Sequence, residues 1–158
     1  MSSILSRGTA DGAADGAATL RIVAAIVIGT DGRHLLVRKR GTTSFIQVGG
    51  KIEPGEAPLA AMVREAEEEV GLRFSPERVE VLGRFDAPAA NEPGHVVDAH
   101  AFLVRLLPGE TPRAQAELEE LVWIDPDVPA VSPGTTPSRQ FSIAPLSLDL
   151  LAAWAARR

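Results

Sequence analysis

The chain has 158 residues, 45% of them apolar, which is enough to bury the core of one domain but leaves little for a second. It contains no cysteine, so disulfide frameworks, thiolate metal sites and cysteine nucleophiles are excluded. Acidic residues outnumber basic ones by 21 to 16, the wrong sign for a protein that binds polymeric nucleic acid through its phosphates. The longest apolar run, 22–28, is too short to span a membrane, so we expect a cytoplasmic protein without a membrane partner.

The first 19 residues are rich in alanine and glycine, and few of them are large enough to pack. We therefore expect a disordered tail at 1–19 and one domain at 20–158. The domain begins with an apolar run that predicts a strand buried on both faces, and Asp31-Gly32 then predicts a hairpin to a second strand. Together, the apolar runs predict strands at 20–28, 34–38, 45–48, 79–85, 96–107 and 121–124.

A helix is predicted at 58–70, because Pro58 suits its first turn and Gly71 suits the position just beyond its end. A closing helix is expected at 146–156, after a proline-rich loop at 126–140 that either covers the site or only connects elements. At about 100° per residue, five apolar residues of the first helix share one arc and predict its core face. They are Leu59, Met62, Val63, Ala66 and Val70.

The same helix carries three acidic residues on a second arc, namely Glu65, Glu68 and Glu69, whereas Glu67 points elsewhere. These carboxylates repel one another, and Arg64 supplies only one fixed positive charge. A divalent cation is the natural further partner, and an all-oxygen ligand set favours Mg²⁺, with Mn²⁺ or Ca²⁺ as alternatives. Acidic runs also occur on solvated helix faces, but here a glycine-rich loop offers backbone groups at one end of the patch.

The stretch 50–72 resembles the Nudix box, G-x5-E-x7-R-E-U-x-E-E-x-G-U, with Ala66 at the first aliphatic position. Its fixed positions are Gly50, Glu56, Arg64, Glu65, Glu68, Glu69 and Gly71. One departure is Val48, where many family members have proline before the two glycines. The order of elements around the box is also similar to the Nudix fold, an α/β fold in which a mixed sheet is sandwiched between helices.

The resemblance implies that Mg²⁺, or Mn²⁺, is held by the side chains of Glu65, Glu68 and Glu69 and by the carbonyl of Gly49. It also implies an ion pair between Glu56 and Arg64 that positions the loop against the helix. The implied reaction is attack of water on a P–O–P linkage. The implied substrate is a nucleoside triphosphate or another nucleoside diphosphate derivative.

The resemblance leaves the general base open between a box glutamate, Glu65 or Glu69, and a glutamate from a later loop. The later candidates are Glu92, Glu117, Glu119 and Glu120. Among these, Glu119 and Glu120 rank first, because they come just before the strand predicted at 121–124, where a side chain can reach the site.

Substrate contacts are harder to predict. The candidates for phosphate binding are Arg38, Lys39, Arg40 and Lys51, of which Lys51 lies inside the loop. The aromatic residues that can stack on a base are Phe45, Phe85, Phe102 and Trp123, although aromatic residues in apolar strands more often belong to the core.

Two alternatives remain open on the sequence. An ADP-ribose hydrolase is one, because Pro88 follows Leu72 at a spacing similar to that of such enzymes in the family. A non-catalytic module that only binds a nucleotide is the other, and the intact box disfavours it, because binding alone does not require three like charges on one patch. The first strand and the closing helix can either pack within one chain or form a homodimer.

Overall fold

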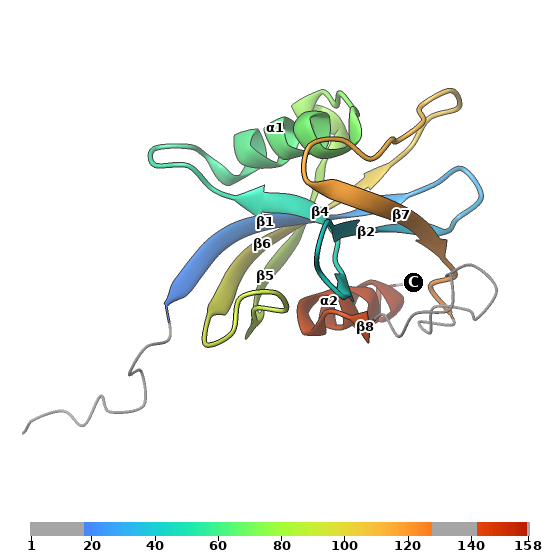
Figure 1. The fold of residues 1–158 in the computed structure, drawn as a ribbon. Coiled ribbons are helices and arrows are strands. Elements are labelled where there is room, and N and C mark those ends of the chain that lie inside the picture. Colours follow the sequence, from blue (N-terminus) through green and yellow to red (C-terminus); the bar gives the residue numbers. More distant parts are fainter. Residues whose placement is uncertain (1–17, 128–141, 158) are drawn as a thin grey trace, which may run out of the picture.

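A computed structural model describes residues 18–127 and 142–157 of the chain. A mixed sheet lies between two helices, with α1 (Pro58–Val70) on one face and α2 (Pro145–Ala155) on the other (Figure 1). The strands are β1 (Thr19–Ile28), β2 (His34–Lys39), β3 (Ser44–Phe45), β4 (Val48–Lys51), β5 (Glu80–Pro88), β6 (Val96–Arg105), β7 (Leu118–Ile124) and β8 (Ser142–Ile143). This is the expected α/β arrangement.

The long strand β1 organises the sheet, whose strand order is β5-β6-β1-β2-β7, with β4 also paired to β1. It runs parallel to β6 and antiparallel to β2 and β4. Because side chains alternate along a strand, Val23 and Val27 belong to the core under α1, whereas Ala24 and Ile26 belong to the core that includes α2. The expected burial on both faces therefore holds from Val23 onward, while the start of the strand is partly exposed.

Several boundaries differ from the prediction. The pairing of β1 begins at Thr19, which the sequence placed in the tail, while residues 1–17 lie outside the described part of the chain. The run 45–48 is divided between two strands, because β3 pairs with β8 whereas β4 pairs with β1. Between them, Ile46 exchanges two backbone hydrogen bonds of 2.8 Å with Val37 of β2. The loop expected from Gly49 begins only after Lys51, because β4 continues through both glycines.

Near the other end of the chain, β7 begins at Leu118 and not at residue 121. The loop expected at 126–140 lies almost entirely outside the described residues. In the described part of the chain, neither α1 nor α2 has the length and apolar run that crossing a bilayer requires.

Candidate active site

Helix α1 presents its acidic side to β4. Met62, Ala66 and Val70 are buried as predicted, but Leu59 and Val63 are only half-buried. The helix ends at Gly71, whose φ of 69° lies in the left-handed region that glycine adopts readily. The buried face extends to Ala61 and Glu69, so it is rotated toward the acidic flank.

Arg64 joins the loop after β4 to the acidic side of α1. Its Nε and Nη2 each donate to a different oxygen of Glu56 at 2.8 Å, so the expected ion pair is present and bidentate. Its Nη1 donates to Glu65 at 2.9 Å and to Glu68 at 3.2 Å. The donation from Arg64, helped by the backbone N–H of Glu53, lowers the pKa of Glu56 to about 2.

Glu69 is a buried carboxylate, with 6% of its surface exposed, and the backbone N–H of Gly49 donates to its Oε1 at 2.8 Å. Burial raises the pKa of Glu69 to about 7; the hydrogen bond from Gly49 opposes this shift, and the charge of Glu65 adds to it. Burial also raises the pKa of Glu65. Two neighbouring carboxylates are therefore held where water solvates them poorly.

The two glycines of β4 allow close approach on two sides, Gly49 to the backbone of β1 and Gly50 to a carboxylate of α1. A Cβ at Gly49 would collide with the carbonyl oxygen of Val23 in β1, and a Cβ at Gly50 would collide with the carboxylate of Glu65. Gly50 is therefore required because an acidic side chain occupies the space where its own side chain would lie. The sequence motif contains Gly50, but it does not show that the carboxylate of Glu65 is the group that excludes a side chain there.

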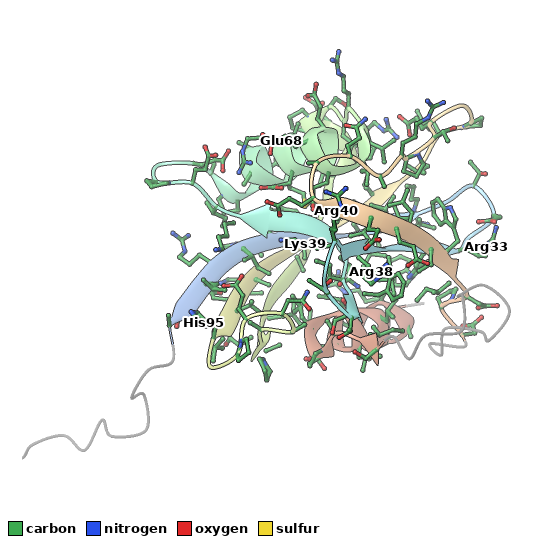
Figure 2. All side chains as sticks on the ribbon, in the orientation of Figure 1. Arg33, Arg38, Lys39, Arg40, Glu68 and His95 are labelled. Atoms are coloured by element: carbon green, nitrogen blue, oxygen red, sulfur yellow. The ribbon has the colours of Figure 1, made fainter. Side chains whose placement is uncertain are left out.

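Glu68 lies at the rim of the site, with 55% of its side chain exposed (Figure 2). Its carboxylate accepts a hydrogen bond from Arg64. Across 18–127 and 142–157, no three acidic or histidine side chains already converge as a metal cluster. The available donors are nevertheless all oxygens, and the charge of Glu65 raises the pKa of Glu69, as expected for crowded negative charges. This donor set fits a hard divalent cation such as Mg²⁺ or Mn²⁺.

The sequence predicts that Arg38 faces phosphates, but Arg38 lies in β2 with only 7% of its surface exposed. Its guanidinium donates to Glu120 at 3.0 and 3.2 Å, to Glu119 at 3.1 Å and to the carbonyl of Thr42 at 2.9 Å. The expectation that Glu119 and Glu120 precede a strand is wrong, since both lie within β7. Arg38 and the two glutamates connect β2 to β7.

Lys39 and Glu117 lie at the site instead. Burial raises the pKa of Glu65 and Glu69, and the charge of Lys39 opposes this rise in both, whereas the charge of Glu117 adds to it in Glu69, so both groups act on these carboxylates. The Nζ of Lys39 lies 3.9 Å from Oε2 of Glu117, whose side chain is 80% exposed. Arg40, the next residue, is exposed. The alternation of a regular strand would separate Arg38 from Lys39, but the pairing of β2 with β7 shifts register between these two residues, so the sequence pattern does not settle which of them faces the site.

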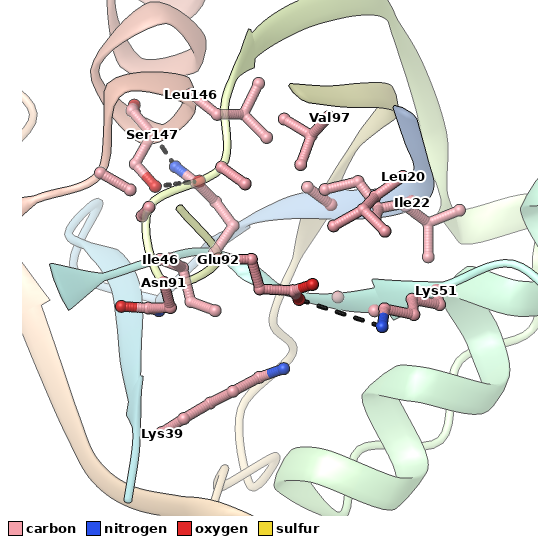
Figure 3. A pocket seen from close by; sticks show the side chains of 18 of the residues that line it. Leu20, Ile22, Lys39, Ile46, Lys51, Asn91, Glu92, Val97, Leu146 and Ser147 are labelled. Atoms are coloured by element: carbon pink, nitrogen blue, oxygen red, sulfur yellow. Dashed lines mark hydrogen bonds and ion pairs between the residues drawn. The ribbon is translucent and has the colours of Figure 1, made fainter. Parts of the chain in front are cut away.

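A cavity of about 300 Å³ lies beside the glycines of β4. Its walls are mainly aliphatic, and Lys39 extends toward a mouth where Nζ of Lys51 lies 3.9 Å from Oε1 of Glu92 (Figure 3). No aromatic side chain from the described residues lines it. Phe45 and Phe102 are buried in the core, as aromatic residues in apolar strands usually are.

A sequence model of the NUDIX domain matches residues 18–144. The chain belongs to the Nudix family. A CTP pyrophosphohydrolase of Escherichia coli K12 is 30% identical over 141 residues, which cover 86% of this chain and 92% of that protein. An ADP-ribose pyrophosphatase of Methanocaldococcus jannaschii is 32% identical over 102 residues, 63% of this chain and 58% of that protein. Membership of this family, together with relatives named as a pyrophosphohydrolase and a pyrophosphatase, makes the chain a Nudix hydrolase.

One relative is a much longer protein than this chain. An octanoyltransferase of Myxococcus xanthus is 36% identical over 99 residues, 61% of this chain, but the match spans only 28% of that longer protein. Among solved structures, the solution structure of the Escherichia coli ORF135 protein matches with a TM-score of 0.62 and 29% identity. That match covers 90% of this Nudix hydrolase and 92% of the ORF135 chain, so the likeness extends well beyond the box.

Proposed function

We propose that this Nudix hydrolase is a Mg²⁺-dependent pyrophosphohydrolase that cleaves a P–O–P linkage of a nucleoside triphosphate or a related nucleoside diphosphate derivative by attack of water. The observation that carries the proposal is a pair of carboxylates, Glu69 buried and Glu65 half-buried, facing the glycines of β4 beside a cavity. Like charges confined in this way favour a cation, and a nucleotide with a cation bound to its phosphates suits the adjoining space.

In this proposal Glu65, Glu68, Glu69 and the carbonyl of Gly49 hold the ion. When bound, a divalent ion neutralises charge that develops on the phosphates and makes water a better nucleophile. The role of Arg64 is to position carboxylates, since it contacts Glu56, Glu65 and Glu68 at once. Mn²⁺ suits the same oxygen ligands.

Lys39 and Lys51 are the proposed phosphate contacts, because both line the cavity and Lys39 also acts on the buried carboxylates. A nucleotide phosphate entering the mouth competes with Glu92 for Lys51, since their 3.9 Å contact is solvent-exposed and weak. Arg38 is not included, because its guanidinium is bound within the sheet.

The proposed proton acceptor is Glu69 or Glu117. Neither carboxylate is bound to an arginine of the described residues, whereas Glu65 accepts from Arg64. Glu117 replaces Glu119 and Glu120 as the later candidate, because those two residues accept hydrogen bonds from Arg38. General base catalysis requires a carboxylate that is free to accept a proton, and of the two candidates only Glu117 is not also a proposed ligand of the ion.

The test is turnover of a substrate panel with and without Mg²⁺, using Glu68→Gln beside the wild type. The panel contains the common nucleoside triphosphates, ADP-ribose, a dinucleoside polyphosphate, NADH and a short 5′-triphosphorylated RNA. We expect Glu68→Gln to lower kcat/KM by about 100-fold or more. The matched control is Glu67→Gln, since Glu67 is the adjacent residue and pairs with Arg73 on another side of α1. Equal losses in both variants would contradict the proposal.

Two alternatives are outcomes of the same panel. Pro88 lines the cavity, and one relative is named an ADP-ribose pyrophosphatase, so ADP-ribose cut faster than every triphosphate would assign that activity. Binding of nucleotide and Mg²⁺ without turnover would assign a binding module instead.

A further inference from the structure

We infer that Gln47, held in place by Ser147 of α2, reads the polar edge of the nucleobase and is a specificity-determining residue of this enzyme. The inference rests on the proposed function, because it assigns the base to the cavity beside the buried carboxylates. It concerns which nucleotide is accepted, and not how the P–O–P linkage is cut.

Gln47 is a polar residue where an aliphatic one would be expected. It lies between β3 and β4 and is only 4% exposed, and Ser147 is only 1% exposed. Both line the cavity, together with aliphatic neighbours that include Leu146 and Val97. A buried amide is tolerated only when it is hydrogen-bonded, so its presence in an apolar wall requires a partner.

Ser147 is that partner, and it also orients the amide. Its Oγ donates to Oε1 of Gln47 at 2.5 Å, and Nε2 of Gln47 donates to the backbone oxygen of Ser147 at 3.4 Å (Figure 3). Because a backbone carbonyl only accepts, the nitrogen of the amide must face Ser147 O, and the amide cannot flip without losing that bond.

An oriented amide retains capacity for a ligand. A glutamine side chain has two N–H donors and two acceptor positions on its oxygen. Among the described residues, Ser147 uses one donor and one acceptor position, which leaves one of each on a side chain that lines the cavity. A nucleobase edge carries the donors and acceptors that complement these two positions.

Among the residues that the structure describes, no aromatic side chain lines the cavity, which gives this amide more influence. Aliphatic walls favour any flat ring by burial and discriminate weakly between bases. Lys39 and Lys51 lie toward the mouth, and their charges suit phosphates and not a neutral base. A site built to hydrogen-bond a substrate group rejects an analogue without that group, so Gln47 is the group expected to choose among bases.

The test uses pairs of nucleotides that differ at one polar position, CTP against UTP and ATP against ITP. Each pair exchanges an amino group for a carbonyl and reverses the adjoining ring nitrogen. We expect wild-type kcat/KM to differ by about 10-fold or more within at least one pair. Gln47→Leu should reduce that ratio to about 3-fold or less, because leucine fills a similar space without polar atoms.

Ser147 is a positioning residue with its own prediction. Ser147→Ala removes the hydroxyl and leaves the amide held only by the 3.4 Å bond to the backbone oxygen of residue 147, so the ratio should fall. Ser147→Thr should restore the ratio. The double variant Gln47→Leu/Ser147→Ala removes both partners and leaves neither one unsatisfied. The matched control is Ser44→Ala, since Ser44 is also buried, pairs with Ser142 at 3.1 Å and does not line the cavity.

The outcomes separate this inference from the proposed function. If triphosphates are cut but Gln47→Leu preserves the wild-type ratio, or the wild type shows none, the role of Gln47 is overturned while the hydrolase stands. If no nucleotide is cut, the proposed function fails, and dissociation constants for the same pairs then replace kcat/KM. A ratio of dissociation constants that Gln47→Leu abolishes supports the inference, and an unchanged ratio overturns it.

Discussion

Arg64 and Glu56, eight residues apart, are joined by two hydrogen bonds of equal length, 2.8 Å each. The pair closes the loop after β4 onto α1, and the Nη2 of the same guanidinium also donates to the carbonyl of Lys51 at 3.1 Å. One arginine thus fixes where the loop ends and where the acidic side of α1 lies relative to it.

Arg64→Lys should reduce turnover more than stability. Lysine keeps the charge but cannot make the two parallel bonds to Glu56, so the loop and Glu65 lose their fixed positions. We expect kcat/KM to fall by about 10- to 100-fold with a small change in melting temperature. Arg73→Lys is the control, because within the described part of the chain Arg73 forms one ion pair, with Glu67, and it is exposed. Full activity in Arg64→Lys would show that the bidentate geometry is unnecessary.

Gly50→Ala should weaken cation binding while leaving the fold intact. The added Cβ meets the carboxylate of Glu65, which can move because it is the end of a side chain, but moving it displaces a proposed ligand. Mg²⁺ titration by calorimetry should show at least about 10-fold weaker binding. Gly109→Ala is the comparison: its Cβ meets nothing within 4 Å, and its φ of +89° costs about 1 kcal/mol of stability without reaching the site. Equal Mg²⁺ affinity in the two variants would contradict the role given to Gly50.

Lys39→Met should raise KM for a triphosphate by about 10-fold, because a charged contact at the mouth of the cavity is lost. Arg40→Met removes the same charge from the next residue, which is exposed, and should leave KM within about 2-fold of the wild type. Steady-state kinetics at fixed ionic strength distinguish the two. A larger effect in Arg40→Met would mean that Arg40, and not Lys39, contacts the substrate.

Stability at acidic pH should depend on Glu110. Its pKa is lowered by hydrogen bonds from Arg78, at 2.5 and 2.8 Å, and the backbone N–H of Leu107 also donates to it. A carboxyl whose pKa is lower in the folded state stabilises the fold above its unfolded pKa, 4.5, and loses this contribution as pH falls through the folded value.

Glu110→Gln should therefore lower the free energy of unfolding by about 1 kcal/mol at neutral pH. The difference from the wild type should shrink as pH falls below 4.5. Urea unfolding at several pH values measures it, with Glu77→Gln as the exposed control from the same region. A difference that does not change with pH would exclude the ion pair as its source.

The sequence predicts the part of the site that lies within one helix and its adjoining loop. Glu65, Glu68 and Glu69 share a side of α1 because helical periodicity alone brings them together. Glu56 and Arg64 are placed by the motif in the same way. Such local relationships require no knowledge of how strands pair.

The rest depends on contacts between distant segments. Lys39 and Glu117 are 78 positions apart and meet because β2 pairs with β7, with a register shift between Arg38 and Lys39. A register shift of this kind changes which side chain faces which side, and no spacing in the sequence records it. The cavity was likewise not predictable, because its walls come from β1, the β5–β6 connection and α2 together.

Three consecutive residues connect the two helices through the sheet. Gln47 is bonded to Ser147 of α2 on one face, and Gly49 is bonded to Glu69 of α1 on the other, with only Val48 between them. A change that shifts the backbone at Gln47 therefore also shifts the donor that holds Glu69. Under the inferred role of Gln47, redesign of base preference is restricted to substitutions that preserve the main chain of this segment, and insertions or prolines there should impair base selection and hydrolysis together.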